Sequence, residues 1–338
     1  MKKPNPLSMA DLNRLPLLLG LGLVLAGSAW MIGNAWKAQH PSARHELLDI
    51  RPGSDLRDSG ISPRFPVERL SNYRIETGRG VDIRLGIVDY RDDAGQARSV
   101  IVYPANPGTG LAAEPGTRMS LWGSTAQAIR EHTQEDALFL SWWDNAQRIH
   151  FLTGRETWPR QAARSGFADS PLRDFWIKAA GGAARDEQPA IQLAKWLTMD
   201  AEQALADIRR ALPSNRPLYW LVCVDDLARL GEIEALSGVK IPLEMRYFPP
   251  APNIHAQIAA VRRWASEAGD LGNYLVQQIP GGGVKAWRIT TEAGSRTLLA
   301  RLLPFTQALE NPLPDTHLVH QSTWGAYLVI HEILPART

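Results

Sequence analysis

The sequence contains almost no cysteine: Cys223 is the only one in 338 residues. A lone cysteine forms no intramolecular disulfide, and the Cys-x-x-Cys-His pattern of covalent haem attachment is absent from the sequence. The spacing of cysteine and histidine that is typical of zinc sites is missing as well. Cys223 lies inside the apolar run 218–224, where we predict a buried structural role. We therefore expect no bound cofactor and no metal site in this chain.

The sequence also lacks a marked excess of positive or negative charge, since 37 lysines and arginines nearly balance 35 acidic residues. The arginines are scattered among the acids and form no basic stripe, so we expect no nucleic-acid partner. His317, His320 and His331 form the densest group of histidines, but a metal site there is the weaker interpretation. The sequence has no phosphate-binding loop, no nucleophile elbow and no evident Ser/His/Asp set. We assign no catalytic residue and leave enzymatic activity open, favouring a protein without one.

A long apolar run is present at the N-terminus, where residues 15–36 carry no charge. As a helix this run measures roughly 33 Å, which is enough to cross the hydrocarbon core of a bilayer. Basic residues precede it, and Trp30 and Trp36 lie near its far end, as interfacial anchors do. By the positive-inside rule we predict a cytoplasmic tail over 1–14 and one transmembrane helix over 15–36 in the inner (cytoplasmic) membrane. The bulk of the chain then lies in the periplasm.

A cleaved signal peptide is the alternative explanation of this N-terminus. The basic start, the apolar residues 15–25 and the small residues Gly27, Ser28 and Ala29 also suit a signal peptidase. The apolar stretch continues past that point through Ile32, which is longer than the apolar region of a signal peptide usually is. We favour retention of the helix, and both interpretations place the rest of the chain outside the cytoplasm.

After the apolar run, we divide the chain into three segments. Residues 37–116 read as a stem followed by a β-hairpin, with strands near 81–90 and 97–104 joined by a turn at 92–95. Residues 117–250 alternate strand and helix signals, as an α/β domain requires. Residues 251–338 begin with an amphipathic helix at 254–269 and continue as a β-rich part. We predict an exported mixed α/β fold preceded by one transmembrane helix.

Within the α/β segment, several elements have clear signals. We predict a strand at 119–122, a helix that begins at Ser124 or Thr125, and a strand over 137–143, which together form a β-α-β unit. A helix pattern covers 189–212, with Asp200 as the cap of its second half. Further strands follow at 217–224 and 241–249, and in the C-terminal part at 273–280, 284–290, 296–305 and 324–334.

Two tryptophans and an acid follow the predicted strand 137–143 where a buried strand ends. Trp142, Trp143 and Asp144 are typical of a site at the mouth of a sheet, because ligands of open parallel sheets collect outside the carboxyl ends of strands. Asp225 and Asp226 end the next buried strand in the same way. The competing interpretation is that Asp225 and Asp226 cap the helical segment 226–236 and that Asp144 caps a helix that begins near Ala146. We name Trp142, Trp143, Asp144, Arg148 and Arg155 as the candidate residues for binding a ligand or a partner.

The block SWWDNAQRIHFLTGRETWPR, residues 141–160, resembles the region around the WWDYG motif of oligosaccharyltransferase catalytic subunits. The likeness continues weakly over 195–226. In that family the segment helps to bind the acceptor sequon, which would give Trp142, Trp143 and Asp144 a binding role. Asn145 and Ala146 replace the Tyr and Gly of the motif, and such enzymes build their catalytic site from many membrane helices, whereas this chain has one candidate span. The resemblance therefore implies the soluble fold without the activity.

A fuller resemblance is to the HaoB family, the hydroxylamine oxidation proteins of ammonia- and methane-oxidising bacteria. It rests on the single N-terminal span and on the blocks LSWWDNAQRIHFLTGR, IHAQIAAVRRWASEAG, YLVQQIPGGGVKAWRI and HQSTWGAYLVIHEILP. The resemblance implies association with hydroxylamine oxidoreductase, the periplasmic multihaem enzyme. It maps no chemistry onto individual residues.

Together these observations predict a membrane-anchored periplasmic accessory protein that docks, tethers or helps to mature hydroxylamine oxidoreductase. The rival hypothesis is a non-catalytic sugar- or peptide-binding domain related to glycosyltransferase soluble domains. A pocket beside Trp143 and Asp144, with Arg148 or Arg155 pointing into it, would favour the rival. If these side chains are buried and satisfied by one another, the rival loses its basis.

Overall fold

The computed structural model describes residues 43–53, 56, 61–76, 82–102, 113–168, 170–213, 215–267, 272–278, 283–322 and 328–335. The predicted transmembrane helix over 15–36 lies outside these residues. Among the helices that are described, none is both long and apolar enough to cross a bilayer. By internal contacts the chain divides into one unit of residues 1–44 and 76–83 and a second unit of residues 45–75 and 84–338. The second unit holds nearly all of the described residues, and the features below belong to it, apart from Arg44, Glu76, Asp82 and Ile83 at the ends of three strands.

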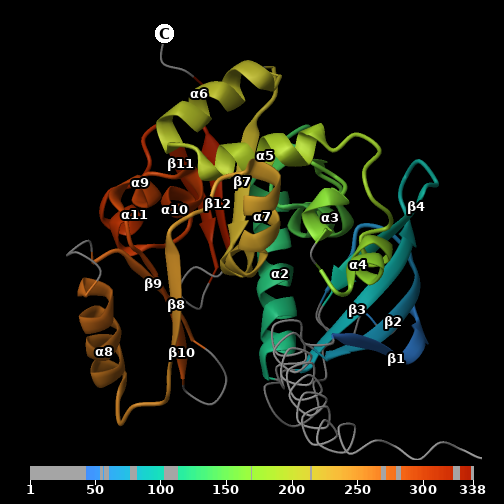
Figure 1. Cartoon of the computed structure of the whole chain (residues 1–338). Helices are drawn as coiled ribbons and strands as arrows, with labels where there is room; N and C mark the ends of the chain where they lie inside the picture. Colours follow the sequence, from blue (N-terminus) through green and yellow to red (C-terminus); the bar gives the residue numbers. More distant parts are fainter. Residues whose placement is uncertain are drawn as a thin grey trace, which may run out of the picture. The chain divides into compact units, whose positions relative to one another are not determined.

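The N-terminal part of this unit is a four-stranded sheet with strand order β1-β2-β3-β4 (Figure 1). Its strands are β1 (Arg44–Pro52), β2 (Val67–Glu76), β3 (Asp82–Arg91) and β4 (Ala97–Val102). The predicted hairpin is confirmed, because β3 and β4 pair antiparallel. In its turn, the Asp92 carboxylate accepts hydrogen bonds from the backbone N–H groups of Ala94 and Gln96, and Gly95 adopts φ +71°.

A five-stranded mixed sheet forms the centre of the unit, with strand order β11-β12-β7-β5-β6. The strands are β5 (Leu138–Leu140), β6 (Glu156–Trp158), β7 (Leu218–Cys223), β11 (Thr316–Gln321) and β12 (Leu328–Ile333). β5 runs parallel to both β6 and β7, whereas β12 is antiparallel to β7 and β11. All six residues of β7 are buried, which explains why its sequence is a continuous apolar run.

Helices pack around this central sheet and on the neighbouring four-stranded sheet (Figure 1). They are α2 (Ala113–His132), α3 (Trp143–Thr153), α4 (Arg173–Ala179), α5 (Gln188–Thr198), α6 (Ala201–Ala211) and α7 (Leu230–Ser237). The predicted helical pattern at 189–212 is confirmed as α5 and α6. Asp200 is the cap between them, and its carboxylate accepts a hydrogen bond from the Glu202 backbone N–H.

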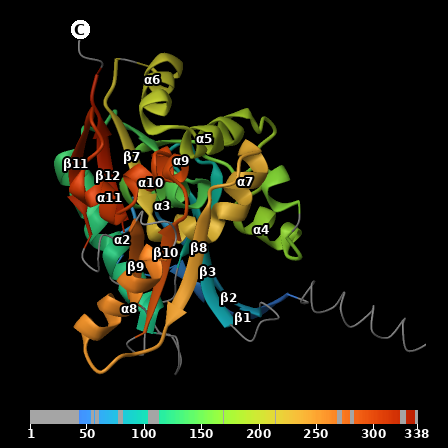
Figure 2. The ribbon, with the colours of Figure 1, turned by 60° about the vertical axis from the view of Figure 1, so that its left-hand side comes forward.

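A three-stranded antiparallel sheet covered by one helix follows in the chain. The strands β8 (Leu243–Phe248), β9 (Tyr274–Gln278) and β10 (Val284–Ile289) have the order β8-β10-β9. Helix α8 (Ile254–Ser266), shown in orange beside these strands in Figure 2, confirms the predicted amphipathic helix. Its Val261 and Trp264 pack on Phe248, Val284 and Ala286 in one buried cluster.

Two predicted strands are wrong. Residues 119–122 belong to helix α2, which begins at Ala113, so Ser124 and Thr125 do not start a helix. The predicted strand 296–305 contains the short helix α10 (Leu298–Leu302), because the Thr297 side chain accepts a hydrogen bond from the Ala300 backbone N–H and caps a helical turn. Two more short helices, α9 (Glu292–Ser295) and α11 (Thr306–Glu310), lie on either side of it.

The fold is therefore a mixed α/β fold with several sheets, as predicted. The C-terminal part is less β-rich than expected, since its described residues include the helices α8, α9, α10 and α11 among the strands. The central sheet joins strands from two of the predicted segments, because β7 pairs with β12 along its whole length. The boundaries at 116 and 250 remain a prediction, and the first lies close to residues 103–112, which are outside the described part of the chain.

Candidate functional site

The turn after β5 places Trp143, Asp144 and Arg148 on a helix instead of a strand end, with Trp142 as the residue before the helix. β5 ends at Leu140, and α3 begins at Trp143, three residues before the start expected near Ala146. The Ser141 hydroxyl donates a 2.7 Å hydrogen bond to the Leu221 carbonyl of β7, which holds the chain against the sheet as it turns. Asp144 therefore lies in the first turn of α3, where the helix dipole favours a negative charge.

The end of β7 brings a second acid to the same place. β5 and β7 are parallel neighbours with Leu140 opposite Trp220, so their carboxyl ends lie side by side. Asp226 accepts a 2.9 Å hydrogen bond from the Cys223 backbone N–H, as one half of a capping box on the 3₁₀ turn that follows β7. The capping interpretation of this acid is confirmed. Asn145 joins the two strand ends, because its Nδ2 donates to Asp226 Oδ1 at 2.7 Å.

Asp144 is held by two arginines. Its Oδ2 lies 3.1 Å from Arg148 Nη2 and 3.6 Å from Arg229 Nη2. Arg148 also donates to Asn145 Oδ1 at 2.7 Å and to the Ile101 carbonyl at 2.8 Å, and its guanidinium lies over the Trp122 ring. These contacts tie α3 to β4 of the neighbouring sheet. A buried arginine needs such partners, because an unpaired buried charge is very costly.

The two tryptophans share one acceptor. The indole N–H groups of Trp142 and Trp143 donate to the same Glu232 oxygen, at 3.2 Å and 3.0 Å. The other oxygen of Glu232 accepts a 2.9 Å hydrogen bond from Arg229, whose guanidinium also lies over the Trp143 ring. Glu232 and Arg229 were not among the residues predicted from the sequence. The available signal was general: two buried indole N–H groups require an acceptor, and a buried aspartate requires a cation.

The two acids of this network have opposite pKa shifts. Burial raises the pKa of Asp144, but Arg148 and Arg229 outweigh it, so the pKa of Asp144 lies below the usual range and the group stays ionised. Burial, followed by the nearby charge of Asp144, raises the pKa of Asp226 to about 8. Asp226 therefore keeps its proton near neutral pH. Arg148 and Arg229 then have Asp144 and Glu232 as their acidic partners.

Four of the five predicted residues, Trp142, Trp143, Asp144 and Arg148, belong to this network, and Arg155 does not. Arg155 donates to the Thr133 side chain at 3.2 Å and to the Thr133 carbonyl at 2.9 Å, just past the end of α2. All five side chains are buried, with at most 8% of any residue exposed. Their visible contacts are to other parts of the protein, so the structure supports a positioning role. A role in binding a ligand or a partner stays a prediction.

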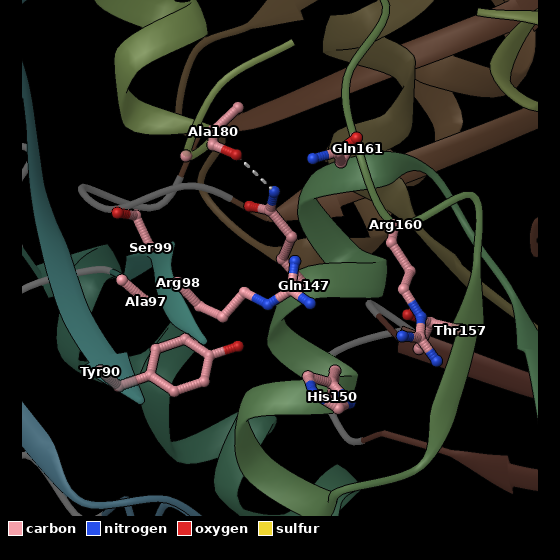
Figure 3. A pocket seen from close by; sticks show the side chains of 11 residues that line it. Tyr90, Ala97, Arg98, Ser99, Gln147, His150, Thr157, Arg160, Gln161 and Ala180 are labelled. Atoms are coloured by element: carbon pink, nitrogen blue, oxygen red, sulfur yellow. Dashed lines mark hydrogen bonds between the residues drawn. The ribbon is translucent and has the colours of Figure 1, made fainter. Parts of the chain in front are cut away.

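A small pocket lies on another face of α3. Its volume is about 50 Å³, and it lies where β3 and β4 meet α3, β6 and the end of α4 (Figure 3). None of the five predicted residues lines it. Its lining residues come from five separate segments, which is why no local sequence pattern indicated it: Tyr90, Ala97, Arg98, Ser99, Gln147, His150, Thr157, Arg160, Gln161, Ala180 and Gly181.

The family of the chain follows from a comparison of the whole sequence with protein-family models. The model for "HaoA-associated protein HaoB" matches residues 12–333. The chain belongs to the HaoB family. All residues of the buried network and of the pocket lie within the matched range 12–333. The family resemblance inferred from the sequence is confirmed.

Two further comparisons add little to this assignment. No curated protein sequence matches the chain. Among solved structures, the crystal structure of the C. jejuni PglB C-terminal domain is similar over 63% of this chain and 99% of that one, with 10% sequence identity and a TM-score of 0.32. A likeness at this level carries no argument about the function of the HaoB family member.

Proposed function

We propose that this protein is a membrane-anchored, periplasm-facing accessory protein that docks, tethers or helps to mature hydroxylamine oxidoreductase. The observation that carries the proposal is the match of residues 12–333 to the family of HaoA-associated proteins. Membership of that family links the chain to hydroxylamine oxidation. The docking role, the membrane anchor and the periplasmic location go beyond the match and belong to the proposal.

A docking protein needs a surface that a partner can bury, and the edge strand β8 is the best candidate. Met245 and Tyr247 are 59% and 52% exposed, and alternate residues of a strand point to the same face. Methionine and tyrosine are enriched at protein interfaces. β8 is the terminal strand in the order β8-β10-β9, so it has one neighbour among the described strands. We therefore propose that the partner covers the Met245 and Tyr247 face of β8.

Co-purification tests both parts of this proposal. A tagged full-length chain is purified from detergent-solubilised membranes after mild crosslinking, and the multihaem partner is detected by its haem absorbance. We expect the natural chain to bring down the partner and the double variant Met245→Glu/Tyr247→Glu to lose most of it. The matched control is Leu318→Glu, which adds a charge at a residue 47% exposed on the edge strand β11.

The outcomes separate the two claims. If the natural chain captures no multihaem protein, the accessory role is wrong. If the double variant captures as much partner as the natural chain, the accessory role stands and the assignment of β8 is wrong. Loss of capture by the Leu318→Glu control would also contradict β8 as the specific surface.

The rival hypothesis, a sugar- or peptide-binding domain, depends on access to Trp142, Trp143 and Asp144. Their indole and carboxylate groups are engaged by Glu232, Arg148 and Arg229, and the pocket described above is lined by other residues. No observation in the described part of the chain favours the rival hypothesis over the accessory role.

A further inference from the structure

Two side chains that line the pocket beside α3 have buried polar atoms that no described residue satisfies. Gln147 Oε1 and Thr157 Oγ1 have no hydrogen-bond partner among the described residues, and both side chains line this pocket. Thr157 is only 3% exposed. Nearly all buried polar atoms of native proteins have a partner, so two such atoms in one cavity indicate an occupant. These residues are independent of the partner surface proposed on β8.

Two more groups are directed into the same space (Figure 3). Burial raises the pKa of Tyr90, so its hydroxyl keeps its proton and can donate. His150 Nδ1 lies 3.1 Å from the Arg155 carbonyl, which can only accept, so Nδ1 carries the hydrogen. Burial lowers the pKa of His150, and the neutral ring therefore presents Nε2 as an acceptor. The pocket thus offers both donors and acceptors.

The charge of the lining favours an anion. Arg98 and Arg160 line the pocket, and none of the lining residues is acidic. Arg98 is paired with Asp92 at 3.0 Å, outside the lining. Arg160 lies 3.4 Å from Glu156, but Glu156 is also bound by Arg216 at 2.6 Å. One carboxylate shared by two arginines leaves this side of the pocket with a net positive charge.

The size of the pocket limits the occupant. A cavity needs roughly 10–15 Å³ for each water-sized position. A volume of about 50 Å³ therefore suits a molecule with roughly four non-hydrogen atoms. Such a molecule must be anionic to meet the arginines and must carry a hydrogen to satisfy an acceptor such as Gln147 Oε1.

We propose that this pocket binds a small oxyanion that carries a hydroxyl group, the class of hydrogen carbonate and hydrogen phosphate. Its unprotonated oxygens accept hydrogen bonds from Arg98, Arg160 and the Tyr90 hydroxyl. Its hydroxyl donates to Gln147 Oε1 or to His150 Nε2. Sulfate and nitrate resemble these ions in shape but carry no hydrogen near neutral pH. They therefore cannot donate a hydrogen bond to Gln147 Oε1 or His150 Nε2.

Calorimetric titration of the full-length, detergent-solubilised protein tests the proposal. Sodium hydrogen carbonate, phosphate, sulfate and nitrate are compared near neutral pH at constant ionic strength. We expect one site per chain for hydrogen carbonate or phosphate, with an affinity about tenfold or more above that for sulfate or nitrate. Hydrogen carbonate and phosphate are titrated separately. The cavity volume favours hydrogen carbonate, which is the smaller ion.

Three variants assign the binding to this pocket. Arg160→Gln is expected to weaken binding about tenfold, whereas the matched control Arg164→Gln, four residues along the chain and exposed, leaves it unchanged. Gln147→Met is expected to remove much of the preference for phosphate over sulfate. Thr157→Val tests the contribution of the buried hydroxyl, and thermal melting shows whether this variant folds. If it does not fold, Arg160→Gln and Gln147→Met still test whether the pocket binds the anion.

Three results would overturn the proposal. Absence of binding for all four anions would mean that the pocket holds water alone. Equal affinities for phosphate and sulfate, unchanged in Gln147→Met, would show that the hydroxyl is not recognised. Equal weakening by Arg160→Gln and Arg164→Gln would place any binding elsewhere. Because these readouts need no partner protein, they do not depend on the docking test.

Discussion

At the residue scale, Arg148 is the centre of the buried network. It joins Asp144, Asn145 and the carbonyl of Ile101, so it connects the start of α3 with strand β4. Its side chain is 3% exposed and that of Asp144 is 8% exposed. Removing one member of a buried ion pair leaves the other charge without compensation, which makes this contact a sensitive point for stability.

We predict that Arg148→Met lowers the free energy of unfolding by about 3–5 kcal/mol, because methionine fills space but leaves Asp144 with Arg229 as its remaining charged partner. Urea denaturation followed by tryptophan fluorescence measures the change. The control Arg164→Met removes an exposed arginine and should alter stability by about 0.5 kcal/mol or less. Similar effects of both substitutions would show that the buried pair contributes little.

Asp226 gives a pH dependence of stability. Its pKa is about 8 in the folded protein and 3.8 in an unperturbed chain. Between these values the unfolded chain has lost a proton that the folded protein keeps, so the free energy of unfolding falls as pH rises. Asparagine cannot ionise, and we predict that Asp226→Asn loses less stability than the natural chain between about pH 5 and about pH 8. Urea midpoints at the two pH values test this, and parallel losses in both proteins would contradict it.

At the element scale, helix α3 makes two different sets of contacts on two faces. Asp144, Asn145 and Arg148 serve the buried network, whereas Gln147 and His150 line the pocket. The sequence indicated a helix here but placed its start too late, because Trp142 and Trp143 favour a strand by propensity. The tertiary hydrogen bond from Ser141 to Leu221 accompanies the turn that ends the strand early.

Helix α8 is the cover of the three-stranded sheet, and Trp264 is its main contact. The Trp264 ring packs edge-on to Phe248 at 5.6 Å between ring centroids, and the Arg288 guanidinium lies over it at 4.7 Å. We predict that Trp264→Ala costs about 3–5 kcal/mol locally and speeds amide hydrogen exchange in β8, β9 and β10.

The control for this prediction is Arg263→Ala, which removes an exposed side chain from the same helix. It should leave exchange in the three strands nearly unchanged. If Trp264→Ala speeds exchange equally in β7 and β12, the three-stranded sheet does not open separately from the central sheet. That outcome would contradict the local effect predicted here.

At the scale of the whole molecule, we expect the apolar run 15–36 to set the location of the protein. We predict that the full-length chain stays in the membrane pellet after alkaline washing, because a retained helix of this length is held by the hydrocarbon core. Mass spectrometry of the mature N-terminus gives the matching measurement. Release of the protein by the wash, together with a new N-terminus near Ser28 or Ala29, would support the cleaved signal peptide instead.

The sequence predicted a good part of the fold from local signals. Helices α5, α6 and α8 follow from the 3.6-residue spacing of apolar side chains, and α6 also from its cap Asp200. The hairpin of β3 and β4 follows from alternation and a turn with Asp92 and Gly95. The errors at 119–122 and 296–305 have one cause: a short apolar run suits a strand and a buried helix equally well.

The sequence by itself determined that Trp142, Trp143, Asp144 and Asp226 follow buried strands closely along the chain, because a continuous apolar run followed by polar residues is a local pattern. Only the tertiary structure decided what these residues do. Arg229 and Glu232, the partners of Trp142, Trp143 and Asp144, come from a segment about ninety residues away along the chain, as the contact of Trp142 with Glu232 shows. Burial and charge pairing depend on which distant side chains the fold brings together, and no local pattern records this. For the same reason the pocket of Tyr90, Gln147, His150 and Thr157 became visible only when five separate segments were assembled around it.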